Sequence, residues 1–249
     1  MKYCVEKLDE GTWLIAEGEG STGVYMYLLE GDREAVLIDT GMGTIPLDEI
    51  IRTLTDKPIS VILTHGHVDH IGSSGLFEIV YMNPKDRELY KLHGSPQMRS
   101  LFTKEKVNPL TPVERLIPIQ EGQIFDLGGR TLRIIDTPGH TVGCVSILDV
   151  ERRWLFTGDT CCRAHVLLQM DYNAGLEAYQ KSIEKLLSLE GEYDITWPGH
   201  HGKPVGKDTI RDFYEATELL LTGKEAGREV ELPMGKSRLF EYKGIGIEY

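Results

Sequence analysis

The sequence has few cysteines and no long apolar run. Its four cysteines, Cys4, Cys144, Cys161 and Cys162, are too few and too irregularly spaced for a disulfide framework in a chain of 249 residues. They also lack the paired C-x-x-C spacing of a structural zinc site. The first residues show no signal-peptide pattern, and no stretch is long and apolar enough to cross a bilayer. These absences favour reduced thiols and predict a cytoplasmic location.

Basic residues are also scarce. The chain has 27 Lys and Arg against 39 Asp and Glu, which gives a formal net charge of -12. An acidic surface repels nucleic-acid phosphates and anionic lipid, so we expect neither nucleic acid nor a membrane as partner. The expected partner is a small-molecule substrate. The sequence leaves the oligomeric state open, with a homodimer as one option.

No internal repeat, low-complexity stretch or Pro/Gly/Ser linker divides the sequence, so we expect a single domain over residues 1–249. Short apolar segments bounded by glycine predict strands, and apolar residues at helical spacing predict helices. Expected strands are 12–18, 23–30, 34–40, 59–64, 77–83, 130–137, 144–150, 153–159 and 194–199; expected helices are 47–54, 84–93, 209–223 and one that Asn173 caps. Two sheets with outer helices make a layered α/β sandwich.

Two segments between these elements carry no motif that identifies a substrate. Four prolines interrupt residues 94–122, so we expect a loop or lid with at most one short helix. Apolar residues there and in 161–172 either line the cleft or pack the loops onto the body: Leu101, Phe102, Val166, Leu167, Leu168 and Met170. The basic residues of the two segments, Arg99, Lys104, Lys106, Arg115 and Arg163, are scattered along the sequence.

The densest chemical signal is a histidine cluster after the predicted strand 59–64. The sequence His65-Gly66-His67-Val68-Asp69-His70 contains three of the eight histidines. Neutral imidazole and carboxylate are the ligands that zinc and similar ions prefer, and a tight loop can turn several of them toward one point. A lone histidine is usually an ordinary core or surface residue, but this spacing indicates a metal site.

Four short motifs extend this signal along the chain. They are HGHVDH (65–70), TPGHT (137–141), TGDT (157–160) and PGH (198–200), with DTG (39–41) before them. Their order and approximate spacing resemble the metallo-β-lactamase superfamily, over residues 12 to 201. The resemblance implies an αββα sandwich with two mixed sheets and outer helices.

The resemblance also implies a ligand set. A first metal takes His65, His67 and His140, a second takes Asp69, His70 and His200, and Asp159 bridges both. A hydroxide between the metals is the nucleophile, with Asp69 and Asp159 as the catalytic carboxylates, and Asp39 orients the metal loop. Two divalent ions are expected, zinc first, with manganese or iron as options because His/Asp sites accept all three.

The implied activity is hydrolysis of a small carboxylic thioester, lactone or ester. The chain resembles the glyoxalase II-like and lactonase-like branches, but CCRAHVLLQMD follows GDT, and Cys162 stands near the position where lactonases carry tyrosine. A phosphodiesterase of the same fold and a mononuclear iron sulfur dioxygenase remain alternatives. No role is assigned to Cys161, Cys162, His165 or His201, and His93 needs only a helix-capping explanation.

Overall fold

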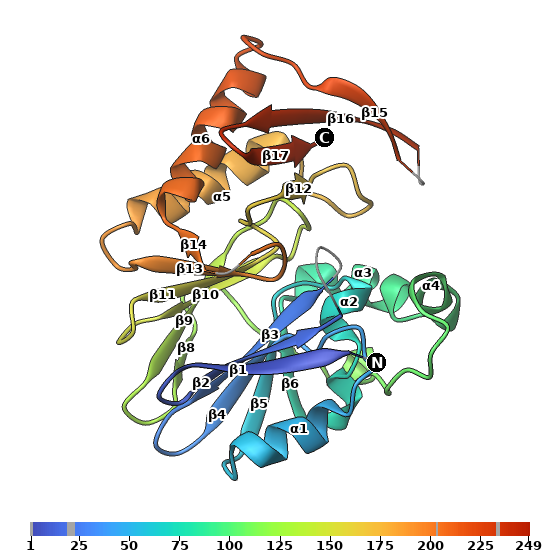
Figure 1. Cartoon of the computed structure of the whole chain (residues 1–249), viewed down its shortest axis with the longest axis vertical. Coiled ribbons are helices and arrows are strands. Elements are labelled where there is room, and N and C mark those ends of the chain that lie inside the picture. Colours follow the sequence, from blue (N-terminus) through green and yellow to red (C-terminus); the bar gives the residue numbers. More distant parts are fainter. Residues whose placement is uncertain (1, 19–22, 203, 233–234) are drawn as a thin grey trace. The chain divides into compact units, whose positions relative to one another are not determined.

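The computed structural model describes residues 2–18, 23–202, 204–232 and 235–249 (Figure 1). The chain forms two compact units, Met1–Ile134 and Ile135–Tyr249, which we call the N-terminal and C-terminal units. The single domain expected over residues 1–249 stays a prediction. Within the described ranges, no helix has the length and apolar character needed to span a membrane.

The N-terminal unit is built on a mixed seven-stranded sheet. Its strands follow one another in the order β1 (Tyr3–Asp9), β2 (Thr12–Glu17), β3 (Val24–Glu30), β4 (Ala35–Ile38), β5 (Ile59–Leu63), β6 (Ile79–Met82) and β7 (Ile117–Pro118). Strands β1 to β4 pair antiparallel, and β4 to β7 pair parallel. Strand β1 was not predicted, because its side chains are mostly exposed and give it no buried face to detect.

Four helices accompany this sheet: α1 (Leu47–Leu54), α2 (Val68–Ile71), α3 (Arg87–His93) and α4 (Pro96–Phe102). Helix α1 buries Leu47, Ile50 and Ile51 in the same apolar cluster as strand residues Leu37 and Val61. The predicted loop 94–122 contains one α-helix, as expected, together with a 3-10 turn and strand β7. Strands β8 (Ile124–Asp126) and β9 (Thr131–Asp136) form an antiparallel hairpin.

In the C-terminal unit, four strands lie in the order β14 (Val205–Gly206), β13 (Ile195–Pro198), β11 (Trp154–Gly158), β10 (Val145–Asp149). Strands β11 and β13 are parallel, with Gly158 opposite Pro198. Parallel strands end at the same edge of a sheet, so the residues that follow these two strands meet there. This register determines where Asp159 and His200 lie.

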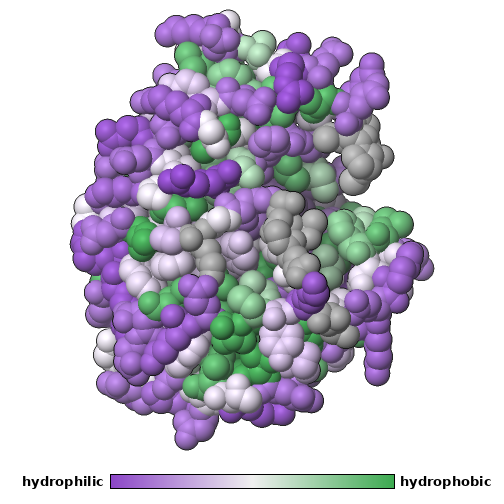
Figure 2. Space-filling view, in the orientation of Figure 1, coloured by the Kyte–Doolittle hydropathy of each residue, from purple (hydrophilic) through white to green (hydrophobic). Residues whose placement is uncertain are grey.

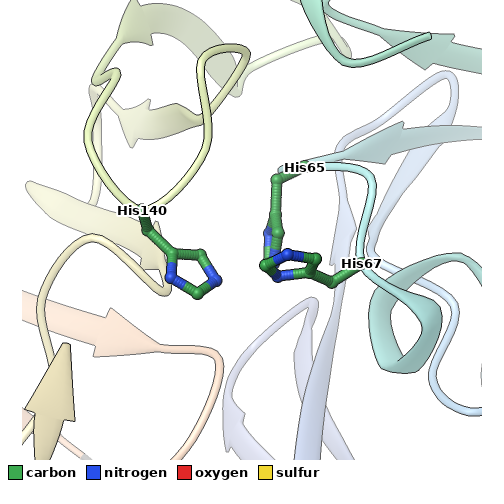
Figure 3. A group of neighbouring side chains, drawn as sticks. All are labelled: His65, His67 and His140. Atoms are coloured by element: carbon green, nitrogen blue, oxygen red, sulfur yellow. The ribbon is translucent and has the colours of Figure 1, made fainter. Parts of the chain in front are cut away.

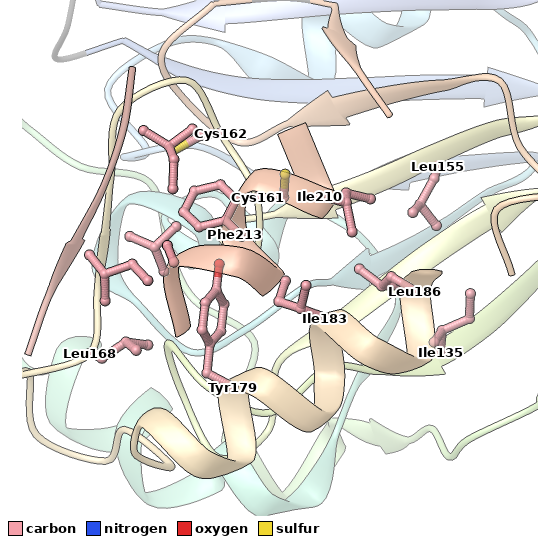
Figure 4. Packing of buried hydrophobic residues seen from close by; sticks show 14 of the residues in the cluster. Ile135, Leu155, Cys161, Cys162, Leu168, Tyr179, Ile183, Leu186, Ile210 and Phe213 are labelled. Carbon is pink, nitrogen blue, oxygen red and sulfur yellow. The ribbon is translucent and has the colours of Figure 1, made fainter. Parts of the chain in front are cut away.

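Helices α5 (Leu176–Ser188) and α6 (Asp208–Leu221) pack on each other around a buried apolar cluster (Figure 4). Tyr179 of α5 and Phe213 of α6 lie in this cluster with ring centroids 6.0 Å apart. The expected cap at Asn173 was wrong: the helix begins after Gly175, and the Asn173 side chain accepts a hydrogen bond from the Gly175 N–H instead.

A further mixed sheet of four strands was not predicted. Its order is β12 (His165–Leu167), β17 (Ile245–Glu248), β16 (Gly235–Tyr242), β15 (Arg228–Leu232). The resemblance implied two sheets, and the C-terminal sequence indicated only short β-prone pieces. The α/β class with mixed sheets and helices is confirmed.

Candidate metal centre

Residues 65–70, which we call the metal loop, follow the carboxyl end of β5 and lead into α2. The side chains of His65, His67 and His70 are buried. The His65 ring centroid lies 4.8 Å from that of His67 and 4.1 Å from that of His70. Figure 3 shows the His65 and His67 rings side by side. Three imidazoles crowded in this way suit a shared positive ion, since three imidazolium charges would repel one another.

Asp39 lies beneath this loop because β4 and β5 are parallel neighbours that end together. Its carboxylate accepts hydrogen bonds from the Thr64 N–H at 2.7 Å and the Thr64 hydroxyl at 2.8 Å, and it bonds the Nδ1 of His70 at 2.8 Å. Asp39 is buried, and its φ of 61° lies in the left-handed region, which Asp adopts more readily than most residues. The structure therefore gives Asp39 the contacts expected of a residue that orients the metal loop.

These contacts also decide which ring nitrogens carry protons. The Thr64 hydroxyl has one proton, which it donates to Asp39. In the 2.9 Å hydrogen bond between Thr64 Oγ1 and His65 Nδ1, the donor is therefore the His65 Nδ1–H. In the same way, His70 donates from Nδ1 to the Asp39 carboxylate. Both histidines then present the lone pair of Nε2, the arrangement that a metal-binding imidazole needs.

The C-terminal unit assembles its own ligand set around Asp159, which follows β11. Asp159 Oδ2 lies 3.5 Å from His140 Nε2 and 3.6 Å from His200 Nε2. His140, drawn in Figure 3, lies in the loop between β9 and β10 and donates from Nδ1 to the Leu167 carbonyl at 2.8 Å. With the proton on Nδ1, the lone pair of this ring is on Nε2, the nitrogen that lies next to Asp159. One carboxylate oxygen between two imidazoles fits a ligand shared between metal ions.

Two side chains that hold the metal loop, Asp86 just before α3 and His93 at its end, were not connected with the loop in the sequence analysis. The Gly66 N–H donates to Asp86 at 2.9 Å, and the Val68 N–H donates to Nδ1 of His93 at 3.2 Å. Both acceptor side chains are buried, and the His93 ring lies 4.7 Å from that of His67. His93 does lie in the last turn of α3, but a capping role alone does not account for its bond to the metal loop. Asp86 and His93 stand seven residues apart, which matches two helical turns, but no local sequence pattern connects them to the loop.

Glu17 was also missed. Its buried carboxylate accepts hydrogen bonds from the Met42 N–H at 2.9 Å and the Thr44 N–H at 2.7 Å, in the turn that follows Asp39. Gly41 has a φ of 68°, and a Cβ there would lie 2.2 Å from Glu17 Oε2. The glycine of the DTG motif is therefore required by both backbone conformation and space.

The structure also shows what surrounds the cysteines and histidines to which the sequence analysis assigned no role. Burial raises the pKa of Cys161 and raises that of Cys162 to about 12, so both thiols behave as small apolar groups of the core. His165 pairs with Glu248 at 2.9 Å. Burial, with help from His200, lowers the pKa of His201 and favours its neutral form.

Val166 and Leu168 are buried in the core of the C-terminal unit rather than exposed to a cleft.

Residues 20–200 match the family model of the metallo-β-lactamase superfamily. The chain belongs to this superfamily. The prediction of a metal-dependent hydrolase is confirmed at this level. A metallo-β-lactamase from Pontibacter korlensis has 17% sequence identity and a TM-score of 0.66, with 87% of this chain and 99% of that chain covered. Its likeness shows the fold, so the predicted metallo-β-lactamase fold is confirmed as well.

Curated relatives include two thioesterases. The acyl-coenzyme A thioesterase MBLAC2 of Bos taurus is 26% identical over 226 residues, which cover 80% of this chain and 81% of the relative. The atrochrysone carboxyl ACP thioesterase of Aspergillus fumigatus is 30% identical over 183 residues, which cover 72% of this chain and 50% of the relative. The chain thus spans about half of the fungal enzyme.

The contact of His93 with the metal loop leads to a first prediction. We expect His93→Leu to weaken zinc binding about tenfold, because the Val68 N–H loses its buried acceptor beside His67. His93→Asn keeps an acceptor near the Nδ1 position and should restore most of the affinity. Chelator competition on both variants measures this difference, and equal affinities would assign His93 to packing alone.

Proposed function

We propose that the two ligand sets together bind two divalent ions, with zinc as the first candidate. In this proposal His65, His67 and His140 hold one ion, Asp69, His70 and His200 hold the other, and Asp159 is shared. The main support is the proton arrangement within each unit: hydrogen bonds at Nδ1 place the lone pair on Nε2 in His65, His70 and His140, as a metal-binding imidazole requires.

Bound ions of this kind activate water at neutral pH and stabilise the charge that develops on a substrate oxygen. The residues around the site orient the proposed ligands. Asp39 and Thr64 hold two imidazoles in one tautomer, and Asp86 holds the backbone between two ligands. Asp69, whose side chain is about a quarter exposed, is the carboxylate of the metal loop that can also accept a proton from water.

We propose a thioester as the substrate class. Support comes from the relatives named as an acyl-coenzyme A thioesterase and an ACP thioesterase. A lactone or simple ester presents the same carbonyl chemistry and is the next candidate. A cytoplasmic location belongs to this proposal, since the described cysteines are free thiols.

Metal content tests the proposed centre. Elemental analysis of the purified, metal-supplemented protein should find about two transition-metal ions per chain, because the seven ligand residues form two sets. One ion or none after supplementation would contradict the dinuclear proposal. A single iron per chain would point to the dioxygenase instead.

Substrate class is tested by steady-state kinetics on the metal-analysed protein. We expect kcat/KM for acyl-coenzyme A thioesters to exceed that for a lactone, an aryl ester and a bis-aryl phosphodiester. The Asp159→Ala variant, purified identically, controls for contaminating hydrolases. A clear preference for the phosphodiester would replace the thioester proposal with the phosphodiesterase.

A further inference from the structure

A cavity of about 340 Å³ lies beside α4 in the N-terminal unit, and we call it the α4 cavity. Its lining includes Pro96, Arg99, Ser100, Thr103, Lys104 and Glu105. The sequence suggested that the basic residues of this segment are scattered, but the structure brings two of them to one cavity. Its lining carries two cations, one acid and two hydroxyl groups, so the net charge of the lining is positive in a chain whose net charge is -12.

Arg99 is an unusual member of this lining because it is only 8% exposed. Its guanidinium donates to two backbone carbonyls, those of Gly72 and Asn108, each at 2.9 Å. Among the residues that the structure describes, no carboxylate forms an ion pair with it, and burial lowers its pKa. A nearly buried cation that contacts only neutral acceptors is stabilised by an anion in the adjoining space.

Through Arg99, the α4 cavity also contacts the segments that support the metal loop. Gly72, whose carbonyl accepts from Arg99, directly follows α2, the helix that carries Asp69 and His70. A Cβ at Gly43, in the turn after Asp39, would lie 2.9 Å from an Arg99 guanidinium nitrogen. Arg99 therefore packs against both segments that support the loop, and a ligand held beside it lies in the same unit as four of the proposed metal ligands.

We propose that the α4 cavity binds the phosphate-bearing part of a thioester substrate, the phosphopantetheine group that coenzyme A and acyl carrier proteins share. This inference rests on the proposed thioesterase function. The cationic groups suit a phosphate, and the apolar part of the lining, which includes Pro96 and Val107, suits the uncharged pantetheine arm attached to that phosphate. Leu101 and Phe102, 75% and 50% exposed, add apolar surface on α4 for the uncharged part of the substrate; an apolar patch is visible over this region in Figure 2.

Lys104 provides the cleanest test because its side chain is exposed, so that the fold should tolerate substitution. We expect Lys104→Glu to raise KM for hexanoyl-coenzyme A about tenfold with little change in kcat, since it replaces attraction for phosphate by repulsion. The same variant should leave KM for S-hexanoyl-N-acetylcysteamine unchanged, because that thioester has no phosphate. Glu105→Gln should lower KM for the coenzyme A substrate, an effect of opposite sign.

Lys106→Glu is the matched control, because Lys106 is an exposed lysine of the same segment outside the cavity lining. Equal effects of the Lys104 and Lys106 variants, or equal effects on both thioesters, would overturn the proposal. A Lys104 effect shared by hexanoyl-coenzyme A and a hexanoyl carrier protein would support binding of the phosphopantetheine phosphate. An effect on hexanoyl-coenzyme A alone would assign the cavity to the nucleotide phosphates and would overturn the assignment to phosphopantetheine.

The same cavity can be tested if no thioester is hydrolysed. Calorimetry should then show coenzyme A binding to the metal-loaded protein, weakened by Lys104→Glu and by added salt. This result would retain the α4 cavity as an anion site while removing the thioesterase proposal. Absence of binding, or an affinity for coenzyme A that Lys104→Glu leaves unchanged, would contradict the cavity proposal itself.

Discussion

Replacing Asp159 with alanine is expected to lower kcat/KM by about three orders of magnitude, the largest loss among the single substitutions considered. Its Oδ2 lies within 3.6 Å of the Nε2 atoms of both His140 and His200. Alanine leaves these imidazoles without the carboxylate between them and removes the one ligand proposed to serve both ions. Metal occupancy should fall together with the rate, which elemental analysis of the variant measures.

His201→Ala is the control for this substitution, because it lies next to a proposed ligand without being one. Burial lowers its pKa, and its backbone φ of 56° lies in the left-handed region. We expect a loss of less than about fivefold at saturating metal, since a relay histidine contributes less than a ligand. The reverse order of the two variants would show that the ligands of the PGHH segment are assigned wrongly.

The metal loop could be recognised from the sequence itself, and the full ligand set was implied by the resemblance that the short motifs carry. The metal loop places four of these ligands within six residues after a β-branched strand, and that strand is recognised by its apolar run. The prediction needed no knowledge of which elements pair. The parallel register of β11 and β13 then explains why Asp159 and His200 come together from positions about forty residues apart.

The supporting residues could not be derived in this way. Glu17, Asp86 and His93 act on backbone N–H groups of segments that lie 20 or more residues away in the sequence. A single buried Glu, Asp or His has no periodic pattern, and its partner is a backbone group that every residue carries. The α4 cavity could not be predicted for the same reason, because Arg99 of α4 bonds to Gly72, which lies 27 residues away in the sequence.

The C-terminal sheet was missed for a related reason. Strands β15 and β16 carry many charged residues, and β12 has only three residues, so neither a clear alternation nor an apolar run marks them. Pairing supplies what the local sequence lacks: β12 and β17 are parallel, and β17 is buried throughout. Short strands that depend on distant partners are the elements that local patterns predict least well.

Asp39→Gly is expected to weaken zinc binding about 10- to 100-fold and to lower the free energy of unfolding by about 2–4 kcal/mol. The carboxylate satisfies a backbone N–H, a hydroxyl and an imidazole, all of them buried. Glycine adopts the φ of 61° at Asp39 without strain, so its effect reports the loss of these contacts alone. Alanine adds left-handed backbone strain and should destabilise the protein further.

Asp39→Asn separates charge from shape. Asparagine tolerates the left-handed conformation and keeps one carbonyl oxygen, but its amide group cannot accept the hydrogen bonds that the second carboxylate oxygen takes from Thr64 and His70. We therefore expect asparagine to retain more stability than glycine while still losing zinc affinity. Chelator competition gives the affinities, and urea unfolding gives the stabilities. If asparagine and wild type bound zinc equally, the tautomer of His70 would not depend on the Asp39 charge, and the contacts from Asp86 and His93 would be sufficient to orient the metal loop.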